Sequence, residues 1–156
     1  MKKILRLGGL LLVAVFLAMQ FFQPERNSGE VTAAHLYRQT QVPPGVQRML
    51  NNACMDCHSN QTNYDWYHRL ALVSWLISQH ITEGKQELNF SEWGSLSVID
   101  RIGLLEDMSG EVKRGAMPLK SYSFIHHEAR LSTAQVDSLA EWIRHYQEGL
   151  LLPVSE

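Results

Sequence analysis

Both cysteines of this 156-residue chain lie in one pentapeptide, Cys54-Met55-Asp56-Cys57-His58. Thiols at this spacing can add across the two vinyl groups of a haem, and a histidine directly after the second thiol is placed to ligate the iron. The pair C-x-x-C is common by itself, whereas a trailing histidine at this offset is much less so. The motif therefore predicts one covalently attached haem c, held by Cys54 and Cys57, with His58 as the proximal iron ligand.

Other uses of the two cysteines stay open at this point. A thioredoxin-like redox dithiol needs alternating strands and helices, and no convincing strand run lies near the motif. A structural zinc site needs four ligands, but His126 and His127 are adjacent where a second ligand pair would be spaced. A structural disulfide or two inert thiols is the remaining use, which an exported protein would permit.

Length and charge limit the class of protein. The chain is long enough for one domain of roughly 120 residues after its N-terminal segment, and too short for two. It carries 14 basic and 16 acidic residues, so it lacks the excess of positive charge that is typical of nucleic-acid-binding proteins. We expect no nucleic-acid partner.

The N-terminal segment has the pattern of a membrane anchor. Lys2, Lys3 and Arg6 precede or enter an apolar run, and residues 4–22 would extend about 28 Å as a helix, close to the roughly 30 Å bilayer core. This pattern predicts a single-pass inner-membrane protein with its haem domain facing the periplasm. The alternative is a cleaved signal that releases the chain to the periplasm, although no good A-x-A cleavage site is present.

The whole chain divides into four segments by composition and periodicity. Residues 1–22 are the anchor or signal, residues 23–41 read as a polar tether, and residues 42–149 as the haem-binding domain, which leaves residues 150–156 as a tail. Apolar residues three and four apart predict helices over residues 46–53, 70–81, 96–112 and 133–146. The domain is therefore expected to be all-α.

Particular residues mark the ends of these predicted helices. Ser132 with Gln135 forms a capping box that opens the last helix. We expect Gly84, Gly115 and Gly149 to end the last three helices, because glycine readily follows a helix C-terminus.

A low-spin electron carrier needs a second axial ligand on the distal side of the iron. The candidates in this chain are Met117, His80, His68, His126 and His127. Met117 lies in a loop, Gly115-Ala116-Met117-Pro118-Leu119, in which glycine permits close backbone approach and proline stiffens the chain. We expect Met117 to be the sixth ligand, with His80, on the apolar side of its predicted helix, as the alternative.

Several stretches beyond the attachment motif also have a characteristic order and spacing: Cys54-Met55-Asp56-Cys57-His58-Ser59-Asn60, Tyr64-Asp65-Trp66-Tyr67, Val73-Ser74-Trp75, His80, Gly84-Lys85, Leu88-Asn89-Phe90-Ser91-Glu92-Trp93 and Gly115-Ala116-Met117-Pro118-Leu119. With them, residues 35 to 148 resemble the haem-binding domain family, bacterial single-haem proteins that are similar to cytochrome c and often exported or membrane-tethered. The resemblance implies haem attachment through Cys54 and Cys57 with His58 proximal, and Met117 on the other side. The chain departs from the family where Asp65 and Leu72 stand in place of expected prolines.

Two functions follow as hypotheses. The first is electron transfer by a monohaem c-type cytochrome with His/Met ligation, which exchanges electrons with redox proteins in the periplasm or membrane and is not an enzyme. In this hypothesis the aromatic residues are candidate pocket walls or haem-propionate donors: Trp66, Tyr67, Trp75 and Trp93. The second is a haem enzyme or gas sensor with an open distal site, where His80 or His126 acts as acid and base, but no clear distal His-Arg pair supports it.

Overall fold

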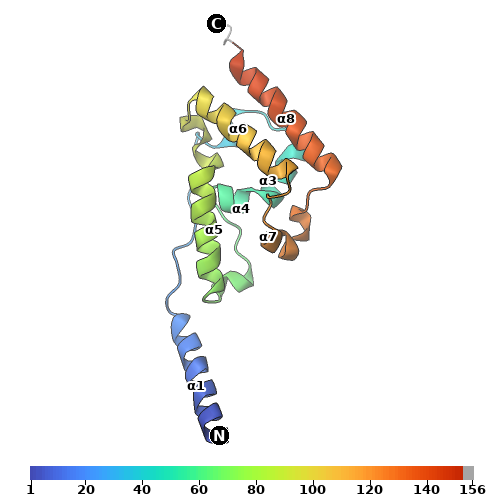
Figure 1. Ribbon diagram of the computed structural model, residues 1–156. Helices are drawn as coiled ribbons and strands as arrows, with labels where there is room; N and C mark the ends of the chain where they lie inside the picture. Colours follow the sequence, from blue (N-terminus) through green and yellow to red (C-terminus); the bar gives the residue numbers. More distant parts are fainter. Residues whose placement is uncertain (153–156) are drawn as a thin grey trace.

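The computed structural model describes residues 1–152 of the chain, which form helices and connecting loops (Figure 1). In chain order the α-helices are α1 Lys2–Met19, α2 Leu36–Gln39, α3 Pro44–Ala53, α4 Met55–His58, α5 Val73–Glu87, α6 Val98–Lys113, α7 Lys120–Ile125 and α8 Thr133–Leu151. Short 3₁₀ helices lie between them: η1 Trp66–Arg69, η2 Phe90–Ser95 and η3 His127–Ala129. The described residues contain no β-strand, only an isolated bridge between Ser28 and Gln61. The all-α prediction is confirmed.

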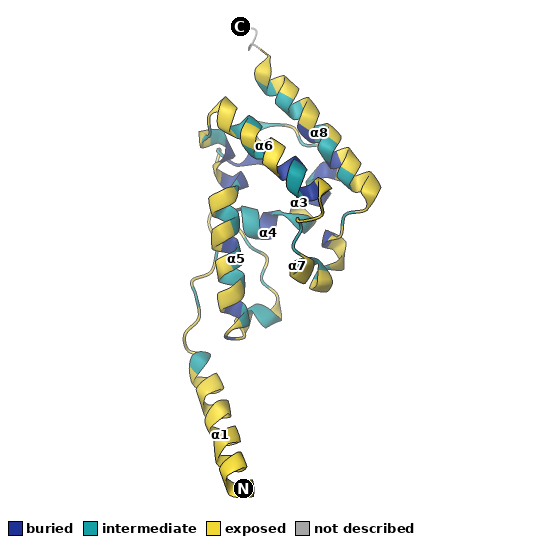
Figure 2. Cartoon of the chain, in the orientation of Figure 1, coloured by how far each residue is buried: buried dark blue, intermediate teal, exposed yellow. Residues whose placement is uncertain are grey.

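Helix α1 extends away from the other helices and buries none of its residues (Figures 1 and 2). It has 18 residues, and these include Lys2, Lys3 and Arg6. Its uncharged part, residues 7–19, is about 20 Å long, which is shorter than the roughly 30 Å core of a bilayer. Among the helices of residues 1–152, none combines the length and apolar character needed to cross a membrane. The predicted transmembrane helix, and with it the single-pass inner-membrane location, is therefore wrong.

The predicted tether, residues 23–41, lies against the helical domain over much of its length. The Asn27 side chain donates to the Ser59 carbonyl at 2.8 Å, and the Gly94 N–H donates to the Ala34 carbonyl at 2.7 Å. Leu36 on α2 is fully buried in the core. This segment is thus packed on the domain from Asn27 onward, and the domain boundary at residue 42 stays a prediction.

The core forms where α6 and α8 pack side by side over α3 and η2 (Figure 1). Figure 2 shows that the buried parts of these helices face one another, as expected for amphipathic helices. Trp93 of η2 is fully buried, and its indole N–H donates to the Tyr146 hydroxyl of α8 at 2.8 Å. The core side chains are Leu36, Val46, Met49, Leu50, Met55, Phe90, Trp93, Leu105, Met108, Val112, Leu139 and Ile143.

The predicted helix ends are partly confirmed. Ser132 and Gln135 form the expected capping box at the start of α8. Gly115 follows the end of α6 with a φ of 68°, a left-handed conformation that glycine adopts at little cost. Gly149 does not end α8, which continues to Leu151. Of the predicted tail, residues 150–156, the part from residue 153 lies outside the described residues.

Helix α5 begins and ends later than its apolar pattern predicts. It runs from Val73 through Gly84 to Glu87, so Gly84 is inside the helix. A Cβ at Gly84 would lie 2.8 Å from the Cys57 carbonyl oxygen, because α5 approaches α4 closely at this point. Glycine is therefore needed here for helix packing, which explains why its position misled the prediction of a helix end.

Leu72, directly before α5, adopts a φ of 71°. Proline is restricted to a φ near −65°, so the proline expected here from the family could not adopt this backbone conformation. A proline at position 72 would therefore require a different backbone conformation directly before α5.

Of the shorter helices, α7, η1, η2 and η3 were not predicted. Residues 88–93 look irregular in sequence, yet η2 covers Phe90–Ser95, and α7, η1 and η3 gave no periodic pattern. A helix of three to six residues is too short to repeat an apolar position, so its formation depends on capping and packing.

We expect Gly84→Ala to destabilise the protein by about 1–3 kcal/mol, because the added methyl group pushes α5 away from α4. The matched control is Gly103→Ala in α6, an exposed position with no atom within 4 Å of an added Cβ. That control should gain about 0.5–1 kcal/mol from helix propensity. Urea unfolding followed by circular dichroism measures both, and equal stabilisation by the two variants would refute the close approach.

Candidate functional site

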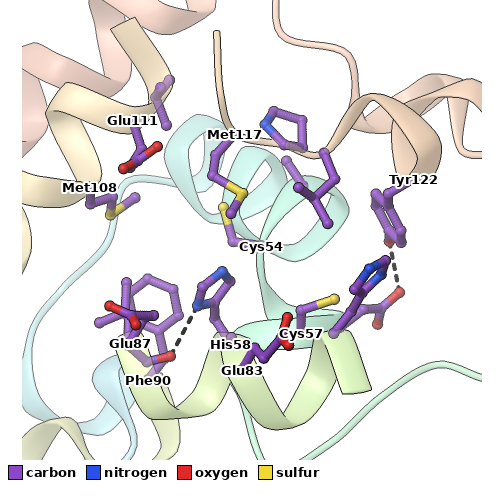
Figure 3. Close-up of a pocket in the computed structure, with 18 of the residues that line it drawn as sticks. Cys54, Cys57, His58, Glu83, Glu87, Phe90, Met108, Glu111, Met117 and Tyr122 are labelled. Atoms are coloured by element: carbon purple, nitrogen blue, oxygen red, sulfur yellow. Dashed lines mark hydrogen bonds between the residues drawn. The ribbon is translucent and has the colours of Figure 1, made fainter. Parts of the chain in front are cut away.

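A cavity of about 600 Å³ lies between α4 and α5 on one side and α6, α7 and the loop before α7 on the other (Figure 3). Its volume is within the range of small-molecule and cofactor sites. Residues of α3, α4, α5, η2, α6 and α7 and of the segments that join them line it: Ala53, Cys54, Asp56, Cys57, His58, His80, Glu83, Gly84, Glu87, Leu88, Phe90, Leu104, Asp107, Met108, Glu111, Val112, Met117, Pro118, Leu119 and Tyr122.

The two cysteines lie at the junction of α3 and α4 and both line this cavity. Their thiols are free, with no disulfide between them. Burial raises the pKa of Cys54 to about 12 and that of Cys57 to about 11, and the charges of Cys57 and Asp56 respectively add to the effect. Both thiols are therefore protonated at neutral pH, whereas a redox dithiol needs an attacking cysteine of lowered pKa.

His58, the last residue of α4, points into the cavity beside Phe90 (Figure 3). Its Nδ1 lies 3.0 Å from the Leu88 carbonyl oxygen, and because a carbonyl only accepts, Nδ1 carries the proton in this hydrogen bond. Burial lowers the pKa of His58, which favours the neutral imidazole. The Nε2 atom is thus left with a free lone pair, the arrangement typical of a metal-ligating histidine.

Of the candidates for a second iron ligand, the structure brings Met117 and His80 to the cavity. Met117 enters from the loop after α6, and Figure 3 shows it on the side opposite His58. The other three candidates lie outside the cavity. His68 bonds to Asp65, the His126 ring contacts the Tyr67 hydroxyl, and His127 is exposed.

Asp56, between the two cysteines, is only 8% exposed and its carboxylate is fully engaged. One oxygen accepts from the backbone and side-chain N–H groups of Asn63, each at 3.0 Å. The other accepts from the Tyr122 hydroxyl of α7 at 2.8 Å. Burial and this hydrogen bond raise the pKa of Tyr122, so the phenol stays a donor at neutral pH.

The cavity walls combine apolar side chains with carboxylates. Phe90, Leu104 and Val112 supply apolar surface, while the acidic residues are Asp56, Glu83, Glu87, Asp107 and Glu111. No lysine or arginine is among the lining residues. These walls suit the apolar face of a large ring but offer no cation for its carboxylates.

The four aromatic residues expected as pocket walls or propionate donors do not line the cavity. Trp93 is buried in the core against Tyr146, and Tyr67 contacts His126. Trp66 is 75% exposed and Trp75 is 37% exposed. The expectation that they wall the cavity was wrong, because the packing of the helices decides which face of the fold each side chain occupies.

The donor set of the cavity fits a covalently held haem better than the alternatives. Two protonated thiols, a neutral imidazole oriented by a carbonyl and a thioether face one space of suitable size. For a zinc ion the fit is poor, since in residues 1–152 no three His, Cys, Asp or Glu side chains are arranged to hold a metal ion. The absence of a disulfide removes support for a simple cystine bridge.

Sequence reasoning missed Asp56 and Tyr122. Tyr122 lies 66 residues from its hydrogen-bond partner, and no spacing rule connects two such positions. Asp56 could have been noticed as a carboxylate inside the attachment motif, but its burial follows only from the packing of α4.

The sequence matches the model of one protein family, described as Haem-binding domain, over residues 14–145. No curated protein matches the chain, and no solved structure does. The matched region covers most of the chain and includes the cavity, the attachment motif and both candidate distal ligands. The family expected from the sequence motifs is thereby confirmed, and the chain belongs to the haem-binding domain family.

Proposed function

We propose that this protein carries one haem c, bound covalently through Cys54 and Cys57, and transfers electrons with His58 and Met117 as axial ligands. The observation that carries the proposal is the cavity itself, into which the attachment motif and Met117 project from opposite walls (Figure 3). Membership in the haem-binding domain family supports the cofactor.

In this proposal each residue has a defined part. The two thiols would add across the vinyl groups, with each S–H hydrogen passing to the vinyl carbon that does not bond to sulfur, an addition that needs no oxidant. The Leu88 carbonyl fixes the His58 ring so that its Nε2 faces the cavity. When bound, a haem with His/Met ligation supplies a one-electron ferric/ferrous couple whose potential is raised by the thioether. Phe90 and Val112 supply apolar surface against which the ring would lie. With both axial positions of the iron filled by protein ligands, its function would be electron exchange with a redox partner protein.

The alternative is a haem enzyme or gas sensor in which Met117 does not bind the iron. His80 also lines the cavity and could act there as an acid or base. The lining residues contain no arginine to pair with it, as a peroxidase-like distal site would need. This favours the electron carrier.

The first test is the state of the haem in the full chain expressed with the attachment machinery. We expect the haem to remain bound through denaturing electrophoresis. Cys54→Ala or Cys57→Ala each leaves one thioether bond, and the double variant should lose its haem in the gel. Haem that is lost from the unmodified protein would contradict covalent attachment.

The second test concerns the distal ligand. We expect Met117→Leu to keep the haem attached but to let carbon monoxide bind the ferrous iron, because leucine fills the space without a thioether. Absorption spectra with and without carbon monoxide measure this. The control is Met108→Leu, which removes a second thioether from the same cavity and should leave the low-spin spectrum unchanged. A Met117→Leu protein that ignores carbon monoxide would remove Met117 from the proposal.

A further inference from the structure

One side chain, Tyr122, joins the cavity wall that carries Met117 (the distal wall) to α4, which carries His58 and is called the attachment helix. Met117 lies in the loop between α6 and α7, and Tyr122 is on α7 directly after that loop. The Tyr122 hydroxyl donates to the Asp56 carboxylate of α4 at 2.8 Å and lies 3.4 Å from the Asn52 carbonyl of α3. Among the described residues, these are the hydrogen bonds that α7 makes to α3 and α4.

The other end of the Met117 loop is held by α6 and not by the attachment helix. The N–H groups of Ala116 and Met117 both donate to the Glu111 carbonyl, at 3.0 and 3.2 Å. The loop is therefore fixed to α6 at its start and to α4, through Tyr122 and Asp56, after its end. His58 is on α4 as well, so the Tyr122 to Asp56 bond connects the two walls that face each other across the cavity.

The hydrogen bond from Tyr122 to Asp56 is well suited to fix the distance between α7 and α4. Asp56 is almost fully buried and is itself held by two donors from Asn63, so its carboxylate does not move freely. A hydroxyl donating to a carboxylate is roughly twice as strong as a hydrogen bond between neutral groups. The Tyr122 ring is further stacked on His126, with ring centroids 4.3 Å apart.

We propose that Tyr122 is a positioning residue, whose hydrogen bond to Asp56 holds the Met117 thioether over the haem iron. The inference rests on the proposed function, since it assigns a part to Tyr122 in the same site. A thioether is a weak iron ligand, so it competes with external ligands only where the protein holds it in place. The strength of distal ligation thus depends on a bond between α4 and α7.

The test is Tyr122→Phe in the full chain with haem attached. The ring and its stacking on His126 are kept, and only the hydroxyl is removed. We expect the haem to stay attached through Cys54 and Cys57, while carbon monoxide binds the ferrous form about tenfold faster than in the unmodified protein. In the same haem-attached protein, amide hydrogen exchange of residues 115–125 should be about tenfold faster, with α8 unaffected.

The matched control is Tyr146→Phe. Its hydroxyl accepts from the buried Trp93 indole at 2.8 Å, and Tyr146 does not line the cavity. This variant also loses one tyrosine hydroxyl hydrogen bond, but it leaves α7 and the Met117 loop untouched. Carbon monoxide binding and exchange of residues 115–125 should therefore stay as in the unmodified protein.

Other outcomes separate this inference from the proposed function. Unchanged carbon monoxide binding and unchanged exchange in Tyr122→Phe would overturn the positioning role while leaving His/Met ligation intact. An equal effect of Tyr146→Phe would also overturn it, since the cause would then be a general loss of stability. If the unmodified protein already binds carbon monoxide freely, Met117 ligation fails, and the positioning role over the iron fails with it.

Discussion

The close packing of α4 against α5 is the contact on which the rest of the site depends. Gly84 lets α5 approach the Cys57 backbone to a distance that any Cβ would prevent. At the end of the same helix, the Leu88 carbonyl accepts the hydrogen bond that orients His58. One helix therefore sets the position of the second cysteine and the orientation of the proximal imidazole, which explains why glycine lies inside a helix where it costs stability.

The two walls of the cavity are built by different means. The proximal wall comes from consecutive residues of α4, whose relative positions follow from local geometry. The distal wall comes from the loop after α6, which is placed by the packing of α6 on α8 and by the Tyr122 to Asp56 hydrogen bond. Substitutions in the core far from the motif would thus displace the wall that carries Met117 while leaving the local geometry of Cys54, Cys57 and His58 unchanged.

Prediction from sequence succeeded where a pattern repeats along the chain. The apolar period gave α3, α6 and α8 with small errors at their ends, and the capping box at Ser132 is as expected. It failed where packing decides the outcome. Gly84 looked like a helix end but is a contact between helices, and α7 is too short to show a period. The N-terminal run looked long enough to span a bilayer, but α1 ends at Met19 and includes three basic residues.

By itself, the sequence determined the all-α class, the family and the local spacing of Cys54, Cys57 and His58, because bonded spacing and helical periodicity fix the relative positions of residues close in the chain. Only the tertiary structure decided which distal candidates reach the cavity, bringing in Met117 and His80 and leaving His68, His126 and His127 outside. It also placed Asp56 against Tyr122 and kept the four aromatic residues out of the cavity walls. These relations join residues that are distant in sequence, so they follow from how the helices pack and not from any local pattern.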